Sequence, residues 1–281
     1  MLFKLSLRMG VIVSIIAFVA EYIDSTIGMG YGTSLAPILL ILDFEPLQVV
    51  PTLLLSELIT GLLAGFTHHS VGNVDFRPKT MNPRKIYRAI RDLGIMQSFR
   101  LGVPLHLKVV LVIAACSIVG TITAVCIALH IPTLILKLYI GVLIMTIGLL
   151  ILITLNKQYP FSWKKVTVLG VVASFNKGMS GGGYGPVVTG GQILSGLNGR
   201  NAVGITSMAE GLTCAVGVLA YMLTKGAVDW LLAPYLVLGA VASIPLSALT
   251  VRKMETRKMR LVIGMITTSL GIFSILKFLL K

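Results

Sequence analysis

Two long apolar runs in the middle of the chain limit what it can fold into. They cover residues 107–130 and 134–156, and each meets the roughly 20-residue length that an α-helix needs to cross a lipid bilayer. Inside lipid, backbone N–H and C=O groups must be paired within the structure, so only helices or closed β-barrels span it. The period-two alternation of barrel strands is absent. The sequence therefore predicts an all-α polytopic membrane protein.

The charge pattern agrees with this class. Only 12% of residues are charged, against roughly 25% in a soluble domain. A net charge of +14 can indicate nucleic acid binding, but in a membrane protein Lys and Arg mostly mark cytoplasmic loops. We expect no nucleic acid partner. The three cysteines lie inside apolar runs and the four histidines at span ends, without the spacing of metal ligands, so we expect no metal and no cofactor.

An internal repeat divides the chain into two halves. The motif GMGYG at residues 28–32 recurs as GGGYG at residues 181–185, and the same shift of 153 carries Glu57 onto Glu210. Later in each half the shift becomes 123, which takes Gly141 onto Gly264. Self-similarity of this kind indicates repeated structural units. We expect two transmembrane repeats, 1–157 and 163–281.

The change of shift locates an insertion in the first repeat. The difference, 153 − 123 = 30 residues, coincides with the strongly basic segment 77–108. Next to a membrane span, such a segment predicts a cytoplasmic loop. It is either a topology marker with a short surface helix or a site for lipid headgroups, and both interpretations stay open.

Each repeat is predicted to hold a re-entrant or broken helical hairpin followed by three full transmembrane helices. In the second repeat, VTVLGVVASF and VVTGGQIL flank the glycines, and about ten residues each reach only mid-bilayer. The loop between the first two full spans is basic in the first repeat and nearly neutral in the second, and the loop between the last two is the reverse. The positive-inside rule then predicts inverted topology. A parallel repeat is the alternative if each hairpin is one broken span.

Two hairpins entering from opposite faces would bring their glycine tips together near the midplane, where inverted-repeat transporters bind substrate. Half-helices beginning near Thr33 and Pro186 carry unpaired N–H groups and partial positive charge, so they can hold a small anion. The alternative is that the glycines only allow close helix packing. The predicted substrate-binding residues are Gly28, Gly30, Tyr31, Gly32, Thr33, Ser34, Asn176, Lys177, Ser180, Gly181, Gly182, Gly183, Tyr184 and Gly185.

Charged residues inside the predicted spans are candidates for function, because charge is costly in lipid. Lys177 is the candidate for attracting an anionic substrate, and the alternative is a salt bridge to Asp24 or Glu210. Glu57 and Glu210 lie mid-span, where a carboxyl group can carry a proton, and the alternative is that they only fix helix packing. The predicted proton-coupling residues are Asp24, Glu57 and Glu210.

The paired tips, the opening IDSTIGMGYGTSLAPILLIL and the stretch GGGYGPVVTGGQILSGLNGRNAVGITSMAEG resemble the sulfite exporter TauE/SafE family of bacterial membrane proteins. The resemblance covers essentially the whole chain, although the basic insertion is longer than a typical family loop. It implies transport of small sulfur-containing anions, such as sulfite or organosulfonates, across the bacterial inner membrane.

The resulting functional hypothesis is a secondary transporter that exports sulfite or a related small anion, coupled to the proton gradient. An organosulfonate uptake permease and a passive anion channel are the alternatives. No Ser/His/Asp, HExxH or cysteine constellation is present, so we expect no enzyme. Membrane lipid is an expected partner, and pairing as a homodimer stays open.

Overall fold

The computed structural model of the chain describes residues 7–42, 44, 46–80, 82–128, 131–132, 160–224 and 228–279, with scattered positions between 135 and 155. Over this part the secondary structure is helical without a strand, which confirms the all-α prediction. The helices are α1 (Leu7–Ile27), α2 (Tyr31–Ile41), α3 (Pro46–Val71), α4 (Pro83–Gly102), α5 (Leu105–Ala128), α7 (Trp163–Ser180), α8 (Tyr184–Leu194), α9 (Gly199–Met222), α10 (Ala233–Lys253) and α11 (Thr256–Leu279).

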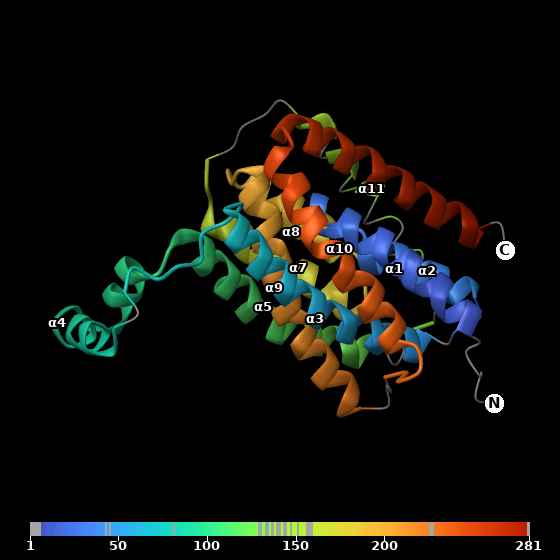
Figure 1. Ribbon diagram of the computed structural model, residues 1–281, viewed down its shortest axis with the longest axis horizontal. Helices are drawn as coiled ribbons and strands as arrows, with labels where there is room; N and C mark the ends of the chain where they lie inside the picture. Colours follow the sequence, from blue (N-terminus) through green and yellow to red (C-terminus); the bar gives the residue numbers. More distant parts are fainter. Residues whose placement is uncertain are drawn as a thin grey trace.

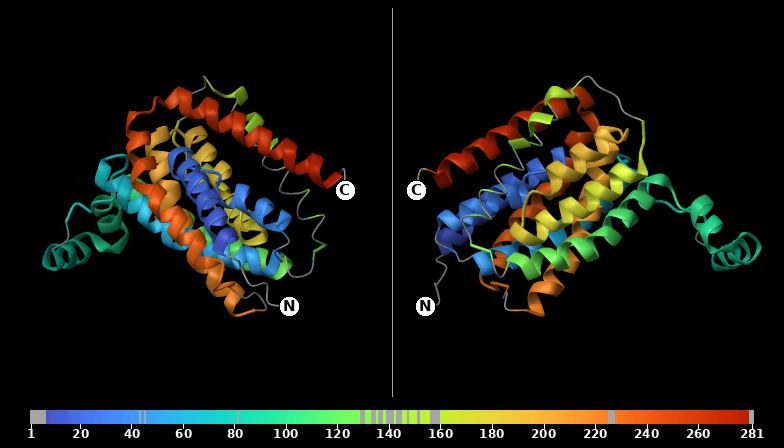
Figure 2. Two further views of the ribbon diagram at one scale, coloured as in Figure 1. Left: turned by 45° about the vertical axis from the view of Figure 1, so that its right-hand side comes forward. Right: turned by 180° about the vertical axis from the view of Figure 1, so that it is seen from behind.

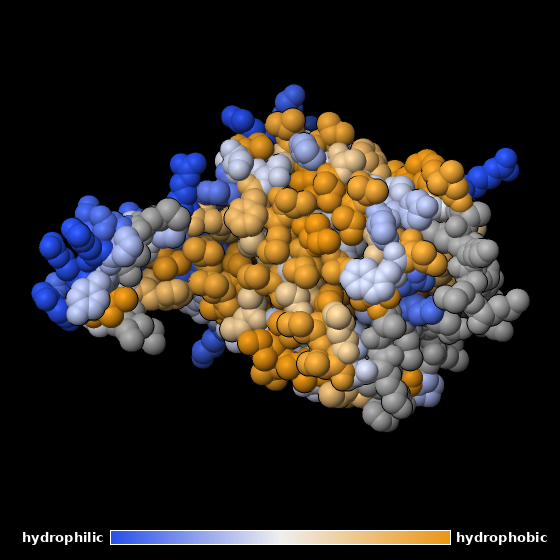
Figure 3. Space-filling view, turned by 60° about the horizontal axis from the view of Figure 1, so that its bottom comes forward, coloured by the Kyte–Doolittle hydropathy of each residue, from blue (hydrophilic) through white to orange (hydrophobic). Residues whose placement is uncertain are grey.

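Several of these helices are long and apolar enough to cross a membrane. Among the described residues, the five candidate spans are Leu7–Ile27, Gln48–Val71, Leu105–Ile127, Gly199–Met222 and Ala233–Lys253. Apolar side chains also cover the outside of the bundle (Figure 3), as expected where lipid replaces water. The span predicted at 134–156 lies partly outside the described residues. The chain is a multi-pass membrane protein.

The centre of the bundle is the contact between α3 and α9 (Figure 1). A Cβ atom built on Gly61 would lie 2.8 Å from the backbone nitrogen of Gly211. One turn later on α3, a Cβ on Gly65 would lie 2.8 Å from the Cβ of Met208. Residue numbers rise along α3 as they fall along α9, so the two helices are antiparallel. Around this pair, α5 packs on α7 and α1 packs on α10 (Figure 2).

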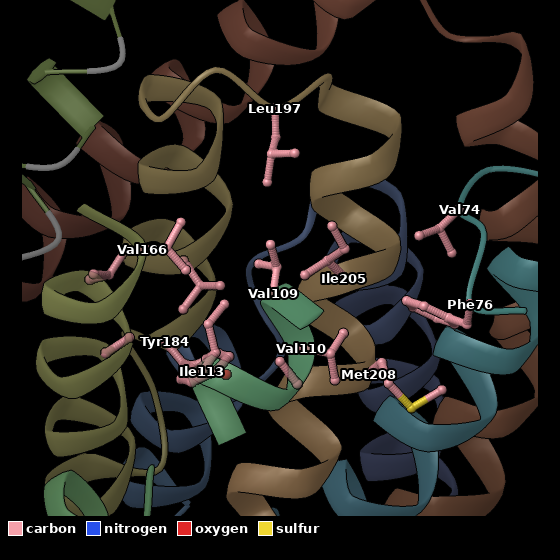
Figure 4. Packing of buried hydrophobic residues seen from close by; sticks show 14 residues of the cluster. Val74, Phe76, Val109, Val110, Ile113, Val166, Tyr184, Leu197, Ile205 and Met208 are labelled. Atoms are coloured by element: carbon pink, nitrogen blue, oxygen red, sulfur yellow. The ribbon is translucent and has the colours of Figure 1, made fainter. Parts of the chain in front are cut away.

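An apolar core lies between α5, α7, α8 and α9 (Figure 4). Because lipid tails are as apolar as leucine side chains, membrane helices associate mainly through close van der Waals packing and hydrogen bonds. The core holds α8 against its neighbours through buried residues from all four helices. Its members are Val74, Phe76, Val109, Val110, Ile113, Val166, Ala173, Tyr184, Val187, Val188, Leu197, Ile205, Met208 and Ala209.

Two hairpins, α1/α2 and α7/α8, end at the glycine motifs. The second arm of each has 11 residues, close to the predicted length. The first arms have 21 and 18 residues, so the prediction of two short pieces is wrong for them. The helix α7 continues past Phe175 because the polar residues that follow have buried partners, as the site below shows.

The two half-helices begin close to the predicted positions. The helix α2 begins at Tyr31 rather than near Thr33, and α8 begins at Tyr184, which makes Pro186 its third residue rather than its first. The N-caps are Gly30 and Gly183, both with positive φ. Inversion of the two repeats as wholes, and their boundaries, stay predictions.

We predict that Gly61→Ala will destabilise the fold. The added methyl group must push α3 and α9 apart, because backbone atoms of Gly211 and Ser207 lie within 3.0 Å of its position. Overpacking of this kind costs about 1–3 kcal/mol, which thermal unfolding of the purified protein in detergent will detect. Gly102→Ala is the control, since a Cβ there meets nothing within 4 Å. Equal midpoints for the two variants would show that the close contact is unimportant.

Candidate functional site

The two glycine tips touch each other at the centre of the bundle. The backbone N–H of Gly183 donates to Oγ1 of Thr33 over 3.2 Å. Oγ1 of Thr189, on α8, donates to the carbonyl oxygen of Gly28 over 2.7 Å. A Cβ on Gly32 would collide with the carbonyl oxygen of Gly181. Glycine is therefore required here by a backbone-to-backbone approach between the two hairpins.

A buried lysine joins the hairpin to the central helix pair. Nζ of Lys177, on α7, lies 2.5 Å from Oε2 of Glu57 on α3 and 2.6 Å from Oε1 of Glu210 on α9. The three side chains are at most 5% exposed. Of the two ion pairs that the sequence offered as the alternative, the structure contains the one with Glu210. Glu57, a second partner at even shorter distance, was not anticipated.

Carboxylates already occupy the N-terminus of the first half-helix. The N–H of Tyr31 donates to Oδ1 of Asp24 over 3.2 Å, and the N–H of Gly32 donates to Oε1 of Glu57 over 3.1 Å. These N–H groups have no partner within their own helix, and they carry the positive end of its dipole. The first tip thus shows the donor geometry that an anion needs, filled here by the protein's own acids.

The second tip differs from the first in its charged residues. The shift of 153 places Lys177 where the first hairpin has Asp24, so a cation replaces the acid one turn before the glycines. Among the hydrogen bonds of the described residues, none joins a carboxylate to the N–H of Tyr184 or Gly185. Glu210, the counterpart of Glu57, contacts Lys177 instead. Among the described residues, the N-terminus of α8 therefore shows no carboxylate cap like the one that Asp24 and Glu57 give to α2.

Glu21 belongs to the same centre and was missed by the sequence analysis. It is 2% exposed, and its Oε1 accepts a 2.5 Å hydrogen bond from Oγ of Ser25. A signal was available, because Glu21 precedes Asp24 by three residues and shares its helix face. A small cavity, with no room for a water molecule, is lined by Glu21, Asp24, Glu57, Thr60, Gly61, Ser207 and Glu210.

Charge balance in this centre requires bound protons. Four carboxyl groups, Glu21, Asp24, Glu57 and Glu210, lie with a single cation, Lys177, and all five are buried. An unpaired buried charge is strongly unfavourable. The excess of buried acids over cations therefore keeps this centre a candidate for proton binding, as the sequence predicted for Asp24, Glu57 and Glu210.

The remaining predicted residues mostly support the tips. Oγ of Ser180 accepts from the N–H of Gly182 and donates to the carbonyl of Asn176. The hydroxyl of Tyr31 bonds Ser56 on α3, and the hydroxyl of Tyr184 accepts from Thr213 on α9. The tyrosines thus tie both half-helices to the central pair. In the described part of the chain, no group of three or more His, Cys, Asp or Glu is arranged to hold a metal ion.

Several apolar spans around a closed, charged centre are typical of membrane transporters. The chain belongs to the sulfite exporter TauE/SafE family, because the family model matches residues 13–81 and 90–274. It is 25% identical over 268 residues to a Bacillus subtilis (strain 168) protein described as "Probable membrane transporter protein YtnM". That match covers 90% of this chain and 78% of the relative. No solved structure matches. The family and this relative identify the chain as a membrane transporter.

We predict that Lys177→Met will destabilise the protein, because it leaves Glu57 and Glu210 buried without a cation. Breaking a buried ion pair from one side costs about 3–5 kcal/mol. The loss should grow as pH rises, because an unpaired buried carboxylate avoids the cost only by holding a proton. Thermal unfolding across a pH series measures this.

Two further variants test the cause. Adding Glu57→Gln and Glu210→Gln to Lys177→Met should restore much of the stability. Lys258→Met should change little, because Lys258 pairs with Glu255 only at the surface. A Lys177→Met protein as stable as Lys258→Met at every pH would refute the role of the ion pairs.

Proposed function

We propose that the protein is a secondary transporter that exports sulfite or a related small sulfur-containing anion, coupled to the proton gradient. The anion would bind at the glycine tips near the midplane. The observation that carries this proposal is the position of Lys177, buried between two glutamates where the two half-helices begin. The family supports a transporter in general terms.

The contacts of Glu57 suggest how an oxyanion would be held. One of its oxygens accepts from a backbone N–H at the start of α2, and the other contacts the ammonium group of Lys177. Backbone N–H groups at a helix N-terminus and a lysine are also what a small oxyanion needs. Glu57 therefore occupies a place where substrate oxygens would sit, and the N-terminus of α8 offers a second set of donors.

This arrangement couples anion binding to proton binding. An anion can take over Lys177 only if a glutamate leaves it, and a glutamate released inside the bundle must take up a proton to avoid an unpaired charge. Anion binding then favours proton binding, and proton binding favours anion binding by the same factor. We infer that the proton and the anion move in the same direction. A sulfite dianion with one proton carries a net charge of −1, so an inside-negative membrane potential favours its export.

The closed state of the centre supports alternating access over an open channel. The cavity among the acids has no room for a water molecule, so the anion enters only after the tips separate. A passive channel would need a continuous opening.

Uptake of organosulfonates would use the same donors as export of sulfite, and the two ligands differ in size. Competition experiments therefore distinguish the two substrates.

The transport prediction is tested with purified protein in liposomes that contain a pH-sensitive dye. An outward sulfite gradient should drive saturable sulfite efflux together with proton efflux, and an inside-negative potential should accelerate it. Sulfate, thiosulfate and taurine serve as competitors. Proton movement opposite to sulfite would overturn the coupling, and sulfite flux without any proton movement would favour a channel or a uniporter.

Glu57→Gln and Glu210→Gln test the couplers one at a time. Glutamine imitates the protonated glutamate, so each variant should still exchange sulfite for sulfite. The proton flux that accompanies net sulfite efflux should fall by about tenfold or more, a factor that corresponds to about 1.4 kcal/mol. Glu255→Gln is the matched control, because that glutamate is exposed and pairs only with Lys258. Normal proton flux in both core variants would remove these residues as couplers without affecting the transporter assignment.

A further inference from the structure

The basic insertion forms an arm that stands apart from the bundle. Residues 77–108 carry eight Lys or Arg and one acid, Asp92, so their net charge of +7 is half of the +14 of the chain. In Figures 1 and 2, α4 projects away from the other helices, and it makes no extensive contact with another described helix. Figure 3 shows hydrophilic side chains gathered on this arm. The arm therefore offers a free, charged surface.

Local sequence shapes the arm into two short helices. The side chain of Asn82 caps the first one by accepting from the N–H of Arg84 over 3.0 Å, and Pro83 occupies its first turn. Gly94, with φ 79° and ψ 162°, breaks the helix. Each piece has about ten residues, and isolated helices shorter than about 12–15 residues are marginal in water. The arm needs a surface to stabilise it.

The first piece separates its apolar side chains from its basic ones. Tyr87, Ile90 and Leu93 recur every three residues and are 68%, 38% and 46% exposed. At 100° per residue they occupy one face, and the opposite face carries Arg84, Lys85, Arg88 and Arg91. Asp92 pairs with the adjacent Arg91, and both side chains remain more than half exposed. Such a helix is typical of those that lie in a membrane interface.

The base of the arm is tied to the ends of two candidate spans. The N–H of Lys79 donates to the carbonyl of Gly102 over 2.9 Å, which closes the arm on itself. Nζ of Lys108, in the first turn of α5, donates to the carbonyl of Arg100 over 2.5 Å. Since α3 ends at Val71 and α5 begins at Leu105, the arm starts and finishes where both spans leave the bilayer. Its apolar face is therefore within reach of the membrane surface.

We propose that α4 docks on the cytoplasmic leaflet and binds anionic phospholipids. Tyr87, Ile90 and Leu93 would enter the boundary between headgroups and acyl chains, and the arginines would contact lipid phosphates. Charge complementarity favours this partner, and the apolar face favours lipid over a nucleic acid because acyl chains can take up Ile90 and Leu93. The family model leaves residues 82–89 unmatched, and these include Arg84, Tyr87 and Arg88 of this surface.

Hydrogen exchange of the full-length protein in nanodiscs tests the proposal. The probes are discs of phosphatidylcholine alone and discs that also contain phosphatidylglycerol. Amides of residues 82–102 should exchange about tenfold more slowly in the anionic discs, since several arginines each gain attraction to the surface. High salt should remove the difference. Exchange of α9 should be the same in both discs.

Substitutions separate headgroup binding from nonspecific charge. Arg84→Gln/Arg88→Gln/Arg91→Gln should abolish the dependence on phosphatidylglycerol. Arg252→Gln/Arg257→Gln/Lys258→Gln, at the exposed end of α10 and the exposed start of α11, should leave it intact. If the first variant does not purify as a folded protein, Ile90→Gln/Leu93→Gln tests the apolar face in the same assay.

Three outcomes would overturn the proposal. Equal exchange in both discs would exclude recognition of anionic lipid. Persistence of the effect in the triple arginine variant would assign it to another part of the protein. Slowing that appears only when polyglutamate or RNA is added would reassign the arm to an acidic macromolecule. None of these results bears on sulfite transport, so the two proposals fail independently.

Discussion

The pairing of Lys177 with Glu57 and Glu210 is the interaction on which the rest of the structure depends. It joins α7 to both central helices, and it allows a lysine to stay at a depth where an unpaired charge would be prohibitive. Because its members carry three charges, two negative and one positive, the arrangement is never neutral unless one acid holds a proton. Stability of the fold and the proposed proton binding therefore rest on the same atoms.

The two glycine tips approach each other closely beside these ion pairs. The tips approach each other through the backbones of Gly32 and Gly181 and are bridged by the side chains of Thr33 and Thr189, so the helix dipoles of α2 and α8 act on one small volume. The two tips are unequal, since Asp24 and Glu57 accept hydrogen bonds at the N-terminus of α2, whereas the sequence position that corresponds to Asp24 in the second hairpin is Lys177. Lys177 contacts both Glu57 and Glu210, and exchange of these partners for an anion is the basis of the proposed coupling.

The sequence predicted most of the fold and many members of the centre. Apolar runs and the GxGYG repeat gave the helical class, the two hairpins and the importance of Lys177, Glu57 and Glu210, because lipid tolerates neither unpaired backbone nor free charge. It failed for the first arms of the hairpins, since a polar residue such as Asn176 reads as a helix end until its surroundings are known. Glu21 was missed although it shares a helix face with Asp24, because only the packing of α1 against the other helices shows the cavity that both residues line.

The sequence by itself determined the class of protein. Local composition is enough to predict the length and hydropathy of the spans, the break at the glycines and the basic character of the arm, because none of these depends on distant contacts. Only the tertiary structure decided which charges meet. Lys177, Glu57 and Glu210 are separated by 120 and 33 residues along the chain, and their pairing arises because α3 and α9 cross at Gly61 and Gly211, where the absence of side chains lets the helices approach. A one-dimensional pattern reveals that charges must be paired in lipid, whereas the partners are chosen by the packing of helices in three dimensions.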